Sequence, residues 1–248
     1  MTAIANPIIA ESYLHPRAFV GGEPSRDEDT SRHFKIRAAD DHGQRSSTNI
    51  LIKRRYEWRG YQNVALPTEQ AGHRITLCAT EEDEVIGTIT VGLDGADGLY
   101  AEDAFCSEVQ ALRKNGIRIC EFTKLAMGAT AGSKHVLASL FHVAYTIAHR
   151  IRGFDMLLME VNPRHVAYYR RMLGCQILGA ERLNRRVSAP AVLLSLDLNY
   201  TREQIRRLGG RPEQAACEKS LYPFAFSEPE EAGIIDRLNR SVWPGKPS

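Results

Sequence analysis

The sequence has few cysteines, and they lie far apart. The five in 248 residues are Cys78, Cys106, Cys120, Cys175 and Cys217, and no two have the close spacing of a zinc site. The chain contains no run of roughly 18 apolar residues that could cross a membrane. Its first segment, MTAIANPIIAESYLHP, lacks the charged start and long apolar block of a signal peptide. We therefore expect a cytoplasmic protein with reduced cysteines, no structural metal and no membrane span.

A strong excess of charge is also absent. The 32 basic and 30 acidic side chains leave a formal net charge of +2, which is too small to favour nucleic acid as a partner. Any functional basic surface must therefore be local. With 43% hydrophobic and 25% charged residues, the composition is that of a globular protein with a filled core.

The pattern of residues divides the chain into three parts. Residues 1–32, which include GGEPSRDEDTSR, are rich in Gly, Pro and charge and are predicted to be a flexible leader. Residues 33–200 alternate between strand and helix patterns. Residues 201–248 are predicted to be a helical extension, in which Ser227 and Glu230 form a capping-box pattern.

The central part predicts an α/β fold in which helices sandwich a mixed sheet. Its helix signals include Gly116 as a terminator, Ser133 as a cap, and Asn162, Pro163 and Gly174 around one short helix. In chain order the predicted strands and helices are HFKIRAAD, STNILIKRRYEWRGY, HRITLCAT, EVIGTITVGL, YAEDAFCSEVQALRKNG, IRICEFTKLAM, KHVLASLFHVAYTIAHRIRG, FDMLLMEV, NPRHVAYYRRMLG, CQILGA and AVLLSLDL, the order β-α-β-β-α-β-α-β-α-β-β.

Three motifs in this part resemble a known family. EVNPRHVAYYRRMLG, APAVLLSLDL and CEFTKLAM are similar to segments of the GCN5-related N-acyltransferases. The resemblance is closest to the FeeM-type N-acyl amino acid synthases, relatives of the acyl-homoserine-lactone synthases. It implies a mostly antiparallel central sheet between helices, followed here by the C-terminal helical extension.

The expected donor follows from a departure from the wider family. Members that use acetyl-CoA carry an Arg/Gln-x-x-Gly-x-Gly/Ala loop, whose N–H groups hold the pyrophosphate. Here the segment reads GATAGSKHVLASL, with Gly128 and Gly132 in a different spacing. A single phosphate could still bind at the helix N-terminus. The loop and the resemblance both favour an acyl carrier protein, whose phosphopantetheine has one phosphate, and no other cofactor is expected.

Four polar residues on two strands are candidates for catalysis and substrate binding. Glu121 is the predicted general base, because an amino acid's ammonium must lose a proton before it attacks a thioester. Its alternative is a salt bridge with Lys124 or a neighbouring Arg. Lys124, where the lactone synthases have Arg, is a predicted substrate contact. Thr123 could bind the amine or acyl carbonyl, or simply the nearby backbone. Glu160 could be a second base or a structural carboxylate that binds substrate.

The helix after Asn162 supplies the predicted acid. Tyr169 lies seven residues after Asn162, where the resemblance places a Tyr that protonates the leaving thiolate. Tyr168 could take this position instead, because one extra residue precedes the Leu-Gly pair. The alternative is an aromatic side chain that packs under the sheet. Asn162 is counted among the substrate-binding candidates.

Two groups of basic residues complete the candidates. In KRRYEWRGY, Arg55 or Arg59 could hold an amino-acid carboxylate; the alternative is a surface helix with its aromatic residues packed inward. A second group could attract an acidic carrier protein, or could be no more than a solvated helix face. Its members are Arg164, Arg170, Arg171, Arg185 and Arg186.

The sequence thus predicts an N-acyltransferase that moves a long-chain acyl group from acyl carrier protein to the amine of an amino acid. Two rivals remain open. An acyl-homoserine-lactone synthase would use S-adenosylmethionine as the acceptor. A non-catalytic module would bind the acyl group or the carrier protein without turnover.

Overall fold

The computed structural model describes residues 34–39, 42–57, 73–128 and 134–241. The predicted leader at 1–32, the predicted cap Ser133 and Arg59 lie outside these ranges. Within them, no helix is long and apolar enough to cross a membrane.

The strands form one seven-stranded sheet in the order β1-β2-β3-β4-β5-β7-β6. All neighbours are antiparallel except β4 and β5, which are parallel. The strands are β1 (Lys35–Ala38), β2 (Arg74–Glu81), β3 (Glu84–Leu93), β4 (Ile119–Met127), β5 (Met156–Val161), β6 (Gln176–Asn184) and β7 (Ala189–Asp197). The predicted α/β class and the mostly antiparallel sheet are confirmed.

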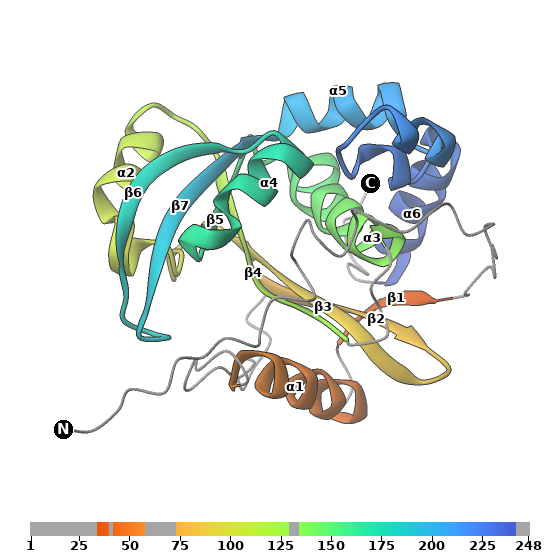
Figure 1. The fold of residues 1–248 in the computed structure, drawn as a ribbon, viewed down its shortest axis with the longest axis horizontal. Coiled ribbons are helices and arrows are strands. Elements are labelled where there is room, and N and C mark those ends of the chain that lie inside the picture. The colour runs from red at the N-terminus through yellow and green to blue at the C-terminus, as the bar shows by residue number, and fades with distance from the viewer. Residues whose placement is uncertain (1–33, 40–41, 58–72, 129–133, 242–248) are drawn as a thin grey trace.

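Helices cover both faces of this sheet (Figure 1). The helices are α1 (His42–Glu57), α2 (Glu102–Lys114), α3 (Lys134–Tyr145) with its π-helical continuation η2 (Thr146–Ile151), η3 (Pro163–His165), α4 (Val166–Leu173), α5 (Leu198–Leu208), η4 (Pro212–Ala216), η5 (Tyr222–Phe224) and α6 (Glu228–Ser241). Helices α1 and α3 lie on opposite sides of β2–β4, while α2 packs on β6. The predicted order of strands and helices is confirmed.

Local signals explain several boundaries. The Asn162 side chain accepts a hydrogen bond from the Arg164 N–H and caps the turn that begins at Pro163. Gly174 ends α4 with a φ of +81°, where a Cβ would lie 2.7 Å from the Tyr200 ring. Glu230 accepts hydrogen bonds from the Ser227 N–H and hydroxyl, as the capping-box pattern predicts.

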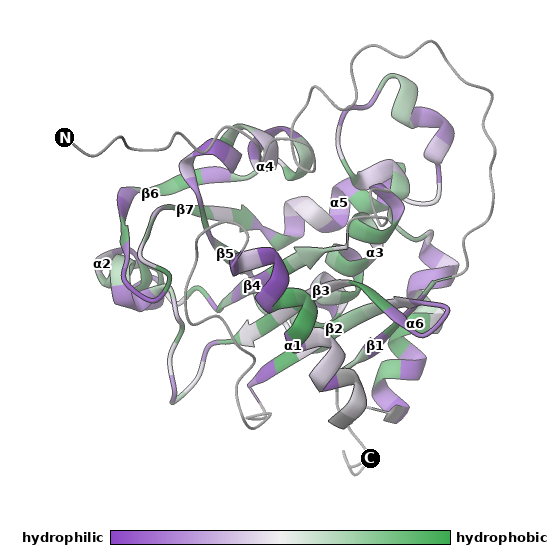
Figure 2. Ribbon diagram, turned by 60° about the horizontal axis from the view of Figure 1, so that its bottom comes forward, coloured by the Kyte–Doolittle hydropathy of each residue, from purple (hydrophilic) through white to green (hydrophobic). Residues whose placement is uncertain are grey.

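The residues after β7 form a C-terminal extension, defined here as residues 198–241. It contains α5, η4, η5 and α6, which gather at one end of the molecule (Figure 1). In Figure 2 the strands and α3 are largely green and hydrophobic, whereas stretches of α2, α4 and α6 are purple. The extension shares the largest apolar core with α3, through residues such as Ile205, Leu208 and Tyr222. The predicted helical extension is therefore part of the folded core.

Candidate functional site

The parallel strands β4 and β5 separate part-way along their length. They pair from Ile119–Met156 to Glu121–Leu158; beyond that point β4 pairs with β3 alone and β5 with β7 alone. A bulge follows at once in β4, where Lys124 has a φ of +52° and its carbonyl accepts a bond from Thr88. Separated strands leave room between them for a ligand.

Glu121 lies at the point of separation, on the α2 face of the sheet. Its side chain is only 2% exposed, and Arg74 donates to it over 2.6 Å. The N–H groups of Tyr100 and Ala101 also donate to it, over 2.9 and 3.1 Å. Gly92 lies between the two charged residues in the sheet, and a Cβ there would come within 3 Å of both side chains. The missing side chain makes room for this buried ion pair.

These contacts weigh against Glu121 as the base. Three donors occupy lone pairs that a base would need for its proton. The pair with Arg74 confirms the alternative of a salt bridge with a neighbouring Arg. The loop that supplies two of the donors is itself tied down, because Arg113 bonds both Asp94 and Glu102 at 2.6 Å. Glu121 therefore has the surroundings of a residue that holds the site in shape.

Glu160 lies further along β5, beyond the separation. Its side chain is 7% exposed and contacts the Arg186 guanidinium, and Asn184 donates to it over 3.1 Å. Burial raises the pKa of Glu160 to about 7, although the charge and hydrogen bond of Arg186 lower it. Such a carboxyl exchanges its proton near neutral pH, which is what a general base requires.

A third predicted residue, Lys124, lies near the same charged residues. The polar cluster, as the term is used below, consists of Glu121, Glu160, Lys124, Arg74, Tyr100 and Arg186. Its ammonium lies 5.8 Å from the centre of the Tyr100 ring, which also has Arg74 at 3.7 Å and Arg186 at 4.9 Å. Burial, and then the charges of Arg74 and Arg186, lower the pKa of Lys124 to about 8, against the effect of Glu121. Three cations thus surround one aromatic ring, and two of them, Arg74 and Arg186, also contact the carboxylates of Glu121 and Glu160.

The sequence pattern did not single out Arg74, Tyr100 or Asn184. Arg74 opens an otherwise apolar strand, RITLCATE, and a charge at such a position is a usable signal because buried charges need partners. Tyr100 lies in a loop without a comparable signal. Arg186 was predicted to dock a carrier protein; its guanidinium contacts Glu160, Asp103 and the Tyr100 carbonyl, and its docking role stays a prediction.

The remaining substrate candidates lie on β4, on α1 and at the end of β5. The Thr123 hydroxyl is buried and has no hydrogen-bond partner in the described part of the chain, so it can still bind a ligand. Arg55 is half-buried on α1, which packs on β3 and β4, and the neighbouring Tyr56 packs inward, as predicted. Asn162 lies at the end of β5 as a helix cap.

The two tyrosines of α4 lie on the opposite, α3 side. Tyr169 is buried, with its ring 6.5 Å from that of Phe141 and 5.4 Å from that of Tyr168. Burial raises the pKa of Tyr168 to about 12, so its hydroxyl remains a proton donor at neutral pH. The packing interpretation of Tyr169 is confirmed, and its role as an acid stays a prediction.

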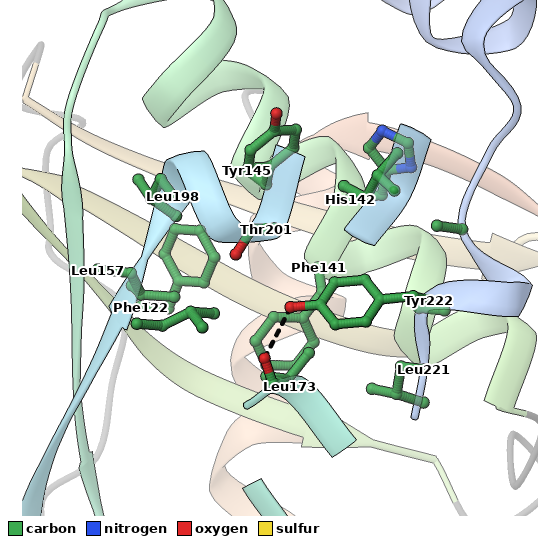
Figure 3. Close-up of a pocket in the computed structure, with 14 residues that line it drawn as sticks. Phe122, Phe141, His142, Tyr145, Leu157, Leu173, Leu198, Thr201, Leu221 and Tyr222 are labelled. Carbon is green, nitrogen blue, oxygen red and sulfur yellow. Dashed lines mark hydrogen bonds between the residues drawn. The ribbon is translucent and has the colours of Figure 1, made fainter. Parts of the chain in front are cut away.

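An apolar pocket lies on that same side (Figure 3). Phe122, the neighbour of Glu121 on β4, lines it together with Leu157 of β5, Phe141 of α3 and Leu173 of α4. Tyr222 of the extension closes it and donates to the Leu173 carbonyl over 2.7 Å. The cavity measures about 30 Å³. The polar cluster and this pocket thus lie on opposite faces of the sheet, at the point where β4 and β5 separate.

The other basic candidates lie at the surface. Arg164, Arg170, Arg171 and Arg185 are partly or fully exposed. Burial, followed by the charges of Lys219 and Arg171, lowers the pKa of Lys134 at the start of α3. Lys134, Arg171 and Lys219 thus form a basic patch across α3, α4 and the extension, and two of its members were missed because they are distant in sequence.

A family model described as N-acyl amino acid synthase FeeM matches residues 47–197. Among solved structures, FeeM, an N-acyl amino acid synthase from uncultured soil microbes, is 26% identical with a TM-score of 0.63, over 71% of this chain and 95% of that one. A putative N-acetyltransferase from Lactobacillus plantarum is 15% identical with a TM-score of 0.49, over 66% and 98%. The AHL synthase LasI is also 15% identical with a TM-score of 0.49, over 68% and 91%. No curated protein matches the chain.

Proposed function

Because the chain belongs to the FeeM-type N-acyl amino acid synthase family, we propose that it transfers a long-chain acyl group from acyl carrier protein to the amine of an amino acid. The fold is that of the GCN5-related N-acyltransferases, and the chain is an acyltransferase. The carrier protein and the amino acid are the proposed part. No cofactor is needed beyond the phosphopantetheine thioester.

One observation carries the proposal: the polar cluster and the apolar pocket lie on opposite faces of the sheet at the point where β4 and β5 separate. A thioester carbonyl placed between the strands would have a polar amine on one side and an alkyl chain on the other. The lining of the pocket, with side chains such as Phe122 and Leu157, suits a saturated chain because burial of each CH₂ contributes about 0.8 kcal/mol.

Glu160 is the proposed base. As an anion it takes a proton from the bound ammonium, and the freed amine attacks the thioester carbon to form a tetrahedral intermediate. Glu121, paired with Arg74, positions the backbone N–H groups and the loop beside it. The sequence predicted Glu121 as the base, with Glu160 as a second base or a structural carboxylate; the roles proposed from the structure are reversed.

Other residues of the cluster would hold the acceptor and stabilise the intermediate. Lys124 is proposed to bind the amino-acid carboxylate, as an ammonium that remains mostly charged at neutral pH. The buried Thr123 hydroxyl would donate to the carbonyl oxygen. Asn162 and Arg55 are proposed to border the acceptor at the end of β5 and on α1.

Collapse of the intermediate breaks the carbon–sulfur bond and leaves a thiolate. Tyr169 is proposed to protonate it, since its ring packs beside Phe141 at the pocket. Tyr168 is the alternative donor, half-buried and in contact with Tyr169. The products are an N-acyl amino acid and the free phosphopantetheine thiol.

An acidic carrier protein is proposed to dock on the basic patch of Lys134, Arg171 and Lys219 and on its neighbours. We expect Arg171→Glu to raise KM for the acyl carrier protein about tenfold at low salt with kcat unchanged, because opposite charges steer association. The effect should shrink at high salt. Steady-state kinetics at two ionic strengths measures both. The matched control is Arg54→Glu on α1, an Arg that is also exposed but lies on the other side of the sheet. An equal rise in KM in both variants would show that the carrier protein does not dock on the basic patch.

The proposal is tested by mass spectrometry of the purified chain incubated with long-chain acyl carrier protein and the twenty amino acids. A parallel reaction contains S-adenosylmethionine, and a third replaces the carrier protein by acyl-CoA. A new N-acyl amino acid formed from the carrier protein supports the proposal, and its mass identifies the acceptor. A lactone would transfer the assignment to a lactone synthase, a product from acyl-CoA alone would overturn the donor, and binding without any product would indicate a non-catalytic module.

A further inference from the structure

The apolar pocket has two kinds of wall. One is built from the sheet, α3 and α4, through side chains such as Phe122, Phe141 and Leu157. The other comes from the C-terminal extension and consists of Leu198, Thr201, Ile205, Leu221, Tyr222 and Ala225. The family model ends at residue 197. The second wall therefore lies outside the residues that the family model matches.

A few polar contacts hold this second wall against the rest of the protein. Near α4, the Tyr222 hydroxyl donates to the Leu173 carbonyl over 2.7 Å and the Leu221 N–H donates to the Met172 carbonyl over 2.9 Å. On the α3 side, the Phe226 N–H donates to His142 over 2.9 Å. Between these two attachments the wall meets the pocket mainly through apolar side chains.

The third attachment is an ion pair beyond the pocket. Glu231 of α6 contacts Arg150 over 2.7 Å and His142 over 3.4 Å. These two contacts join α6 to α3 and to its continuation η2, so they keep the far end of the extension in place. Within the extension, the N–H groups of Gly210 and Arg211 donate to the carbonyls of Ala225 and Pro223, so the segment from Leu221 to Ala225 would move together with the end of α5.

The cavity is too small for an acyl chain, so one of its two walls must move when the chain binds. Its volume of about 30 Å³ is far below the roughly 300–1,000 Å³ of a ligand pocket. The strand residues Phe122, Leu157 and Leu196 belong to a continuous hydrogen-bonded sheet, which resists displacement. The short helix η5 is not part of the sheet, and only the few polar contacts above attach it to α3 and α4, so we expect it to be displaced more easily than the strands.

We propose that the C-terminal extension is the adjustable wall of the acyl pocket and sets the length of the acyl chain that the enzyme accepts. The identity of the ligand as a straight, saturated acyl chain rests on the proposed function. The chain would enter between the sheet and η5, and the Tyr222–Leu173 hydrogen bond would limit how far η5 moves. Ile205 and Leu221 would meet the chain, so their size would determine where it ends.

The test is the dependence of kcat/KM on chain length, with saturated acyl carrier proteins that increase in two-carbon steps. We expect Ile205→Ala and Leu221→Ala to shift the ratio of kcat/KM for long over short chains about tenfold toward long chains, because a methylene in an apolar pocket is worth roughly 10- to 200-fold. Ala225→Leu should shift it toward short chains. The control is Val109→Ala, which removes an equally buried side chain under α2, on the other face.

Tyr222→Phe serves as a second variant in case the alanine variants fold poorly. It keeps the ring and removes the hydroxyl, which bonds to the Leu173 carbonyl and to Thr201, so it should broaden the length profile and leave the fold intact by circular dichroism. Profiles of the pocket variants that match the Val109→Ala profile would overturn the proposal.

Calorimetric titration with free fatty acids of the same lengths separates this proposal from the proposed function. If the chain makes no amide but the pocket variants shift the preferred fatty acid, the wall assignment stands and the enzyme assignment fails. If amide forms and neither the kinetic profile nor the fatty-acid profile moves, the function stands and the wall assignment is wrong.

Discussion

Glu160→Gln is expected to lower kcat/KM for amide formation by about 10²- to 10⁴-fold, the usual contribution of a general base. The amide keeps the size of the side chain and its contact with Asn184 but cannot take a proton. Glu108→Gln on α2 is the control, because Glu108 pairs with Arg182 outside the cluster. Product formation under single-turnover conditions measures the chemical step directly.

The same carboxyl sets the expected pH dependence. Burial raises the pKa of Glu160 to about 7, and the base acts as the anion, so the rate should fall as the pH falls through about 7. This acidic limb should be absent from the residual activity of Glu160→Gln. A variant with the wild-type rate and the wild-type limb would show that another group takes the proton, and Glu121 would then be examined first.

Arg74→Met is expected to lower the free energy of unfolding by about 3–5 kcal/mol, because removal of one partner leaves a buried charge without compensation. Arg74 and Glu121 are 8% and 2% exposed. Arg206→Met is the matched control: Arg206 pairs with Glu203 on the surface and its side chain is 62% exposed, so its loss should leave the free energy of unfolding close to that of the wild type. Urea denaturation measures both.

The double variant Arg74→Met/Glu121→Gln tells structure from catalysis. With both charges removed, part of the lost stability should return, since the penalty comes from the unpaired charge. Equal losses for Arg74→Met and Arg206→Met would mean that the pair does not support the fold. Full activity in the double variant would show that Glu121 is not needed to position the site.

Much of the fold could be predicted from local pattern. The alternating strands, the EEDE turn and the Asn162–Pro163 start of a helix each depend on neighbouring residues, and the structure has them in the predicted order. Glu160 could be placed at the end of its strand for the same reason. These features follow from the periods of strands and helices, which a single sequence records directly.

The partners of the charged residues could not be predicted, because they depend on register between distant strands. Arg74 meets Glu121 only because Gly92 lies between them in the sheet. Arg186 reaches Glu160 because the hairpin of β6 and β7 returns beside β5. The wall of the pocket depends likewise on where the extension folds back, which no local signal states. The contacts of Arg186, which was predicted as a docking residue, could not be foreseen for this reason.

The most direct measurement of the central claim is a crystal structure of the protein with an N-acyl amino acid product. The account predicts the amide nitrogen within about 2.6–3.2 Å of the Glu160 carboxyl, the product carboxylate beside Lys124, and the acyl chain between Phe122 and the displaced helix η5. A product bound elsewhere, or one whose amide lies beside Glu121 with Glu160 still paired to Arg186 and out of reach, would contradict it.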